Sequence, residues 1–370
     1  MEPRAALASW SGDRVTVWTG TQRPFAVRRE LSDALRIPES SVRVVVPNFG
    51  GGFGGRHTGE VAIQGAILWR RAGLAGAGWL VPCRGVHPGL SPPRRRHRRN
   101  VRLWTRGSHQ LPGVHQSQFG HGGPPPVLPP TQPEVDLPTR GLPAPSGGVS
   151  ALAATANSLA RESHIDELAE LAGSDPLSSR RRHLNHPCLA EVLRRVAEAA
   201  GWGAHLSRAG LGWGIAAGLA KDGRIATAVT VEVGGSGELA VRRVVTGHDC
   251  GAVVSPGNLA NRIQGATVMG LGGALFEAIE FEQGQIRNAS LGSYRVPRFS
   301  DVPPIEVILV DRRDQHPAGA GETPFIAVAP ALANAVAVAV GVRLGSLPLV
   351  PAGLVRGYAP GQESPPARPR

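Results

Sequence analysis

Residues 42–60 read VRVVVPNFGGGFGGRHTGE, and this stretch says more about the fold than any other part of the chain. A valine-rich segment runs into a loop with glycines at 50, 51, 52, 54 and 55, interrupted only by Phe53. Glycine lets the backbone approach a ligand closely, and the start of a following helix favours an anion. We therefore expect a strand, a loop and a helix, in which the loop is either a ligand-binding element or a structural turn. It lacks the Lys-Ser/Thr pair of a phosphate-binding P-loop, and its glycine spacing differs from the dinucleotide fingerprint.

The sequence around this loop predicts an irregular mixture of strands and helices. β-Branched runs and period-2 alternation indicate strands, and apolar spacing of three to four residues indicates helices. The expected strands are Arg14–Thr19, Ser41–Pro47, Arg224–Val233 and Glu238–Val245, the last two joined by a Gly-Gly-Ser-Gly turn. The expected helices are Phe25–Leu35, Glu60–Arg71, Leu159–Ala172, Gln264–Glu277 and Phe325–Val340. Because no regular βαβ repeat is present, we expect an α+β fold rather than a doubly wound sheet.

Length and charge narrow the function classes. A chain of 370 residues allows two domains, and three cysteines are too few for an iron–sulfur cluster on this chain. The formal charge of +12 is concentrated in residues 76–150, where nine arginines face two acidic residues and 14 of the 33 prolines lie. The RRRHRR run at 94–99 has no interleaved aromatic residues, so a nucleic-acid-binding module is a weak alternative. No apolar run reaches about 20 residues, so we expect no membrane span.

A second motif places one carboxylate in a loop of small residues. AGAGETPFIAVAPALANAV, from Ala318 to Val336, has Glu322 directly before a largely apolar helix. A glutamate with few polar neighbours suits a general base, and a glutamate at this position also suits a helix cap. Both interpretations stay open at this point.

Two further groups of polar residues are less informative. HLNHPC contains His183, His186 and Cys188, and its pattern favours solvated surface residues over a metal site. Cys250, within DCGAVVSP, is expected to be a buried small residue. No metal-ligating side chain is predicted from the sequence.

Taken in order, these stretches resemble the molybdopterin-binding large subunit of the xanthine dehydrogenase/aldehyde oxidase family, most closely the isoquinoline 1-oxidoreductase β-subunit-like proteins. Residues 17–60 resemble part of the first molybdopterin-binding domain, and residues 161–184 resemble its closing helix. VVTGHDCGAVVSP from Val244, SYRVPRFSDVPPIEV from Ser293, and GAGETP from Gly319 resemble the second. The implied domains are 1–74 (start of the first domain, which is incomplete), 75–150 (non-native and disordered), 151–200 (end of the first), 205–350 (second) and 351–370 (disordered tail).

The resemblance assigns roles to a small set of residues. Gln22 matches the glutamine that hydrogen-bonds a molybdenum ligand; the plain alternative is a polar residue that ends a strand. Gln264 and Gly265 resemble the start of a pterin-contacting helix, with an ordinary packing helix as the alternative. Glu322 matches the catalytic base. The loop beside the metal centre is matched by Gly51, Gly52, Phe53 and Gly54. Arg56 stands where many relatives carry lysine.

The resemblance also implies an activity and its partners. The reaction is oxidative hydroxylation of an N-heteroaromatic compound or an aldehyde, with water as the oxygen source. The cofactor is molybdenum–molybdopterin in its cytosine dinucleotide form. A separate small subunit would carry the [2Fe–2S] centre, and a flavoprotein or cytochrome would accept the electrons. We expect a cytoplasmic protein without a nucleic-acid partner.

Residues 76–150 do not fit the family, although both flanks do. Read from the second base of each codon, the stretches 84–99, 113–120 and 143–148 can encode peptides of the family type, all in one offset. We therefore expect an internal frameshift, which also removes a pterin-binding arginine of the family. In addition, residues 2–6 resemble an interior segment of a full subunit. The expected chain is an impaired fragment, and the alternative is a non-catalytic remnant that only docks a partner.

Overall fold

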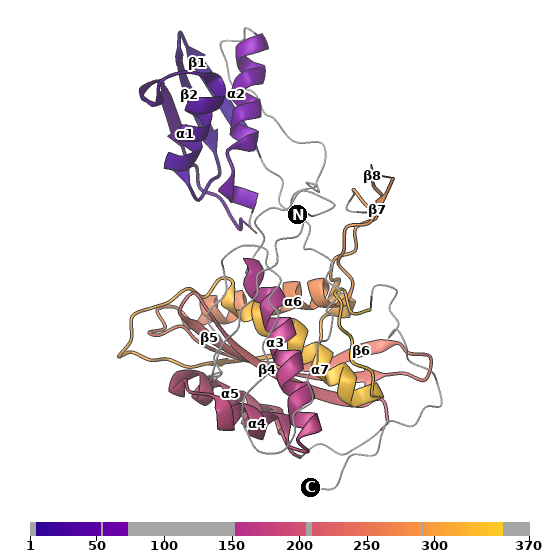
Figure 1. Ribbon diagram of the computed structural model, residues 1–370. Helices are drawn as coiled ribbons and strands as arrows, with labels where there is room; N and C mark the ends of the chain where they lie inside the picture. Colours follow the sequence, from indigo (N-terminus) through magenta and orange to yellow (C-terminus); the bar gives the residue numbers. More distant parts are fainter. Residues whose placement is uncertain are drawn as a thin grey trace. The chain divides into compact units, whose positions relative to one another are not determined.

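The computed structural model describes residues 5–52, 55–72, 152–204, 209–283, 285–290 and 292–350, which form two compact units (Figure 1). The described residues up to 72, with 279–283, 285–290 and 292–294, belong to the first unit. Those from 152 to 278 and from 295 to 350 belong to the second. Strands and helices mix in both units, which confirms the α+β class. The segments 75–150 and 351–370 lie outside the described residues, and the predicted domain boundaries stay predictions.

The first unit is built on a three-stranded sheet. β1 (Ala6–Ser11) pairs antiparallel with β2 (Arg14–Thr19), and β2 pairs parallel with β3 (Val42–Val45). A parallel pair needs a crossover connection, and α1 (Pro24–Leu35) provides it together with a 3₁₀ turn at Glu39–Ser41. β2, β3 and α1 confirm the elements predicted for this part of the chain, and β1 was not predicted.

The helices of the first unit cover a small apolar core. After a 3₁₀ turn at Gly55–His57, α2 (Glu60–Ala72) follows the glycine loop as predicted. The helices place residues four apart on one face, so the buried pairs Val27 with Leu31 and Ala62 with Ala66 lie in the same cluster as the strand valines. A separate two-stranded hairpin, β7 (Phe281–Glu282) with β8 (Gln285–Ile286), is assigned to this unit as well.

The second unit contains a four-stranded sheet in the order β4-β5-β6-β9. β4 (Leu211–Ala220), β5 (Gly223–Val233) and β6 (Leu239–Asp249) are antiparallel, and β9 (Ile305–Leu309) runs parallel to β6. β5 and β6 confirm the predicted pair, and β6 runs four residues beyond the predicted end. The register of β5 against β6 shifts between Thr230 and Val231.

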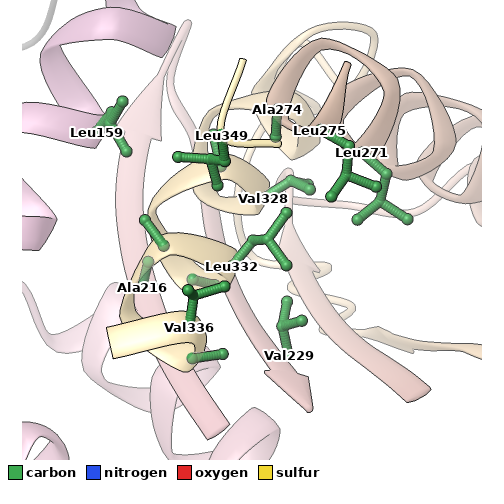
Figure 2. Packing of buried hydrophobic residues seen from close by; sticks show 14 of the residues in the cluster. Leu159, Ala216, Val229, Leu271, Ala274, Leu275, Val328, Leu332, Val336 and Leu349 are labelled. Atoms are coloured by element: carbon green, nitrogen blue, oxygen red, sulfur yellow. The ribbon is translucent and has the colours of Figure 1, made fainter. Parts of the chain in front are cut away.

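Helices cover both faces of this sheet (Figure 1). On one face, α5 (Pro187–Ala200) packs against the sheet; α4 (Pro176–His183) precedes α5 in the chain. On the other lie α3 (Leu152–Leu171), α6 (Pro256–Leu275) and α7 (Val328–Val340). Figure 2 shows Leu332 and Val336 of α7 packed toward Val229, with Leu271 of α6 nearby. Successive strand residues point to opposite faces of the sheet, and buried apolar residues occupy both sets of positions. Both faces of the sheet are therefore apolar.

Helix α7 lies unusually close to β4. A Cβ on Gly212 would be 2.0 Å from the carbonyl oxygen of Ala335, and one on Gly214 would be 2.2 Å from that of Ala331. Only glycine permits this approach. The close contact with α7 therefore explains why β4 has so few β-branched residues. α7 begins at Val328 instead of the predicted Phe325 because a 3₁₀ turn occupies Thr323–Ala327.

A buried charge network joins α3 to α4 and to β4. Arg180 is 3% exposed; its Nε lies 3.0 Å from Glu162 Oε2 and one terminal nitrogen lies 2.8 Å from Asp166 Oδ1. Glu162 Oε2 also accepts a hydrogen bond from Ala217 N at 3.1 Å. Buried ions are tolerated when each is paired and hydrogen-bonded, and this network meets that requirement. It therefore fixes α3 and α4 relative to the sheet.

One described segment has the length and hydropathy of a membrane span. Residues Thr323–Val340 have a mean hydropathy of 1.8, but 78% of them are buried inside the protein. This burial against β4, β5 and α6 is that of the core helix of a folded domain.

Candidate functional site

The structure brings Gln22 and the glycine loop together in the first unit. Gln22 follows β2 and precedes α1, and its side chain is exposed. A Cβ on Gly52 would lie 3.4 Å from Gln22 Oε1, so the amide group lies directly against the loop backbone. Gln22 N donates to the carbonyl oxygen of Arg56 at 3.2 Å, which ties the end of β2 to the far side of the loop.

Arg56 organises this loop, a role that sequence reasoning did not assign to it. Its guanidinium lies over the ring of Phe49, 4.2 Å from the centroid, and its Nε donates to the carbonyl oxygen of Gly51 at 3.4 Å. Its own carbonyl oxygen also accepts from Thr21 Oγ1 at 3.2 Å. One residue therefore holds both ends of the loop. The glycine-loop motif itself could not have revealed this, because the partners come from two segments.

The backbone of the loop leaves room for a ligand. Nothing lies within 4 Å of a Cβ position on Gly50, and Gly51 is exposed. The predicted residues Phe53 and Gly54 lie outside the described residues. Together, an exposed amide side chain and an uncovered glycine backbone can present hydrogen-bonding groups to a cofactor without steric interference.

In the second unit, Glu322 lies at the start of the 3₁₀ turn Thr323–Ala327. Its side chain makes no capping hydrogen bond there, so the geometry does not support the helix-cap interpretation. Instead, Glu322 Oε2 lies 2.5 Å from Nζ of Lys221 in the turn between β4 and β5. Thr323 Oγ1 donates to the carbonyl oxygen of Ala220 at 2.8 Å, which fixes the loop against the same turn.

Gln264 and Gly265 lie in the middle of α6, not at its start as predicted. The helix begins at Pro256, because proline suits the first helical position. Both residues are exposed, and nothing lies within 4 Å of a Cβ position on Gly265. The packing alternative describes the buried small residues of α6, such as Ala266 and Gly270, but not Gly265.

Arg262 of α6 lies beside the Glu322 loop. Its Nη2 lies 3.4 Å from a Cβ position on Gly321, the residue before Glu322. α6 and the Glu322 loop, predicted to share a cofactor site, are therefore neighbours in the second unit. Sequence reasoning missed Arg262 and Lys221, because neither belongs to a motif that the resemblance assigns a role.

A buried polar cluster supports the loop that leads to Glu322. Asp249 accepts hydrogen bonds from Arg312 Nε at 2.6 Å and from Gly251 N at 3.0 Å. The neighbouring His248 is fully buried, and burial lowers the pKa of its imidazole to about 4. The carbonyl oxygen of Cys250, a buried residue as predicted, accepts from Ala318 N at 2.6 Å. Residues 248–251 therefore anchor the start of the GAGETP loop.

The HLNHPC motif has structural roles in the described residues. His186 Nδ1 accepts from Leu189 N at 3.2 Å and caps α5, and His183 Nδ1 lies 2.9 Å from the carbonyl oxygen of Ser179. Among the described residues, no three His, Cys, Asp or Glu side chains are grouped to hold a metal ion.

Comparison with known proteins finds family models and relatives that match parts of this chain. The model for a molybdopterin cofactor-binding domain matches residues 1–73, and a second such model matches residues 223–303. The β chain of isoquinoline 1-oxidoreductase from Brevundimonas diminuta is 35% identical over 52% of this chain and 25% of its own length. These matches support a large subunit of the xanthine dehydrogenase/aldehyde oxidase family.

Other members of the family extend the likeness along the chain. One of the subunits of nicotinate dehydrogenase from Pseudomonas putida is 27% identical over 94% of this chain but only 33% of its own length. The crystal structure of quinoline 2-oxidoreductase from Pseudomonas putida 86 has the same fold, with a TM-score of 0.75 at 16% identity over 95% of this chain and 73% of that one. The chain spans a third or less of the length of these two relatives known by sequence.

Proposed function

We propose that this chain derives from the large subunit of a molybdenum hydroxylase, which oxidises an N-heteroaromatic compound or an aldehyde with oxygen from water. Membership of the family supports the reaction class. The observation that carries the proposal is the position of Glu322: its carboxylate makes no capping bond, lies in the loop beside α6, and is paired with Lys221. A carboxylate held in this way can accept a proton from an attacking hydroxyl.

Each unit by itself presents groups that suit a molybdenum–molybdopterin, which when bound would supply the redox centre and activate water. Gln22 Oε1 and the open backbone of Gly50 and Gly51 provide hydrogen-bonding groups in the first unit. Gln264 and Gly265 provide an exposed, uncovered helix surface in the second. We propose these residues, with Phe53 and Gly54, as the cofactor contacts, and the cytosine dinucleotide as the form of the cofactor.

Electrons from such a reaction must leave through other proteins. The chain has three cysteines, and the two in the described residues, Cys188 on α5 and Cys250 after β6, are both free thiols. A [2Fe–2S] cluster requires four protein ligands. We therefore propose a separate small [2Fe–2S] subunit as partner and a flavoprotein or cytochrome as the acceptor beyond it. We also propose a cytoplasmic location.

We further propose that residues 75–150 arose by a frameshift and that this chain is impaired until the frame is restored. The test compares the chain with a restored subunit, each produced together with a small [2Fe–2S] subunit. Molybdenum content is measured by mass spectrometry, and turnover is measured with an N-heteroaromatic compound and an aldehyde. We expect molybdenum and turnover in the restored subunit. Absence of both would favour the non-catalytic remnant, and copurified nucleic acid would favour the basic module.

A further inference from the structure

Glu322 is paired with the only lysine of the chain. Nζ of Lys221 lies 2.5 Å from Glu322 Oε2, and the chain otherwise contains 39 arginines. The carboxylate side chain is 28% exposed and the lysine side chain 59% exposed. Oε2 itself is enclosed, and the ammonium approaches it outside hydrogen-bond geometry. The contact is therefore an ion pair between a half-buried anion and a hydrated cation.

The backbone that presents Lys221 is unusual. β4 and β5 are joined by a two-residue turn, in which Ala220 is paired with Gly223. Lys221 and Asp222 both have left-handed φ values, 49° and 61°. A turn of this kind favours Asn-Gly or Asp-Gly, because other residues are strained at positive φ. Lysine at the first position is therefore unfavourable for the turn.

Stability does not explain why lysine occupies this position. An ion pair with an exposed lysine contributes little to folding, since water and salt screen it. Strained residues that persist in a fold gather at functional sites. A second cation, Arg262, flanks the same loop at Gly321. The Glu322 loop therefore has cationic side chains near it from both the β4–β5 turn and α6.

We propose that Lys221 is a positioning residue that orients the Glu322 carboxylate for proton transfer. This inference rests on the proposed function of Glu322 as the base. When the carboxylate takes a proton its charge is lost, and the ion pair separates. The ammonium group is exposed, so water can solvate it at that moment. A buried cation would resist this step; an exposed lysine does not.

The first test uses the chain as it exists, without cofactor. Reductive methylation with ¹³C-formaldehyde labels Lys221 and the terminal amine, and both keep their positive charge. The Lys221 resonance is assigned by its loss in Lys221→Asn. We expect Glu322→Gln to shift this resonance, whereas the matched substitution Glu232→Gln, in the exposed pair with Arg242, leaves it in place. A resonance that does not respond to Glu322→Gln would overturn the proposal.

The second test separates positioning from a structural role. Asparagine tolerates positive φ, so Lys221→Asn relaxes the turn and is expected to raise the melting temperature. In the restored, molybdenum-loaded subunit the same variant should lower kcat about tenfold with KM unchanged, equivalent to about 1.4 kcal/mol of transition-state free energy. Lys221→Arg should recover most of the rate. Asp222→Gly, which relaxes the same turn but keeps the lysine, should leave kcat unchanged.

These outcomes also separate this inference from the proposed function. Full turnover in Lys221→Asn would contradict the positioning role while leaving Glu322 as the base. Full turnover in Glu322→Gln at equal molybdenum content would contradict the proposed function and the positioning role with it. A lower kcat in Lys221→Asn that accompanies a lower melting temperature would show a structural role and overturn the proposal.

Discussion

The guanidinium of Arg56 lies where a side chain on Gly20 would have to be. A Cβ on Gly20 would come within 1.5 Å of Nη1 of Arg56. The absence of a side chain at residue 20 therefore lets Arg56 reach across to Phe49 and the glycine loop. This relationship links the end of β2 to the loop that carries the candidate cofactor contacts.

We predict that Gly20→Ala displaces the Arg56 guanidinium from the Phe49 ring. Because the far end of a flexible side chain can move aside, the cost to the first unit should be about 0.5–1 kcal/mol, the contribution of an exposed cation–π contact. Gly50→Ala is the matched control, since nothing lies within 4 Å of its Cβ position. Unfolding in urea measures both. In a double-mutant cycle with Arg56→Ala, the two costs should be less than additive, because removal of the arginine removes the clash. Full additivity would show that the two residues do not interact.

The buried network around Arg180 gives a second prediction. Arg180→Met removes the cation that Glu162 and Asp166 share and leaves them only Arg161 and Arg343. We expect a loss of about 3 kcal/mol in the free energy of unfolding, the low end of the cost of breaking a buried pair. Arg242→Met, which breaks an exposed pair with Glu232, should leave the unfolding midpoint nearly unchanged. Equal effects of the two substitutions would refute the role assigned to the network.

His248 makes the second unit sensitive to acid. Its folded pKa of about 4 lies below the ordinary value of 6.5, so the unfolded state binds more protons between these values. The contribution to stability is fully present above pH 6.5 and is lost as the pH falls toward 4, by about 3 kcal/mol in total. His248→Phe removes this titration, and its unfolding free energy should change less over the same range. Parallel pH profiles for the two proteins would contradict the prediction.

The elements that were predicted correctly are those whose own sequence contains the signal. The valines of β3 and the alternation of β5 indicated strands without any help from the rest of the fold. β4 was missed because Gly212 and Gly214 replace the β-branched residues that mark a strand, and the reason for those glycines is the contact with α7. The start of α6 was placed too late, although Pro256 at its first turn was a usable signal.

In the candidate site, too, some features have a local sequence signal and others depend on contacts across the fold. Gln22, Gly52 and Glu322 were found by resemblance, and the structure adds what each touches. Lys221 lies 101 positions before Glu322 in the chain, and no spacing rule connects them. The neighbours of a side chain across a fold depend on packing, which a single sequence does not specify.

The coding DNA offers a further prediction that needs no protein. We expect two compensating insertions or deletions relative to an intact member of the family, one near codons 74–80 and one near codons 148–151. The intervening DNA should translate in the alternative frame into a family-like segment. Sequencing of this region, with translation in all frames, measures this. An intact frame whose alternative translation bears no likeness to the family would end the frameshift proposal.

The central claim is that Glu322 acts as the base of a molybdenum hydroxylase, and Glu322→Gln tests it most directly. Turnover and molybdenum content are measured together in the restored subunit for the wild type, Glu322→Gln and the control Glu232→Gln. General-base catalysis contributes about 10²–10⁴-fold, so we expect Glu322→Gln to lose at least about 100-fold in kcat at equal molybdenum content, with the control unaffected. A Glu322→Gln variant whose kcat stays within about threefold of wild type would contradict the account, because loss of a general base costs far more than that.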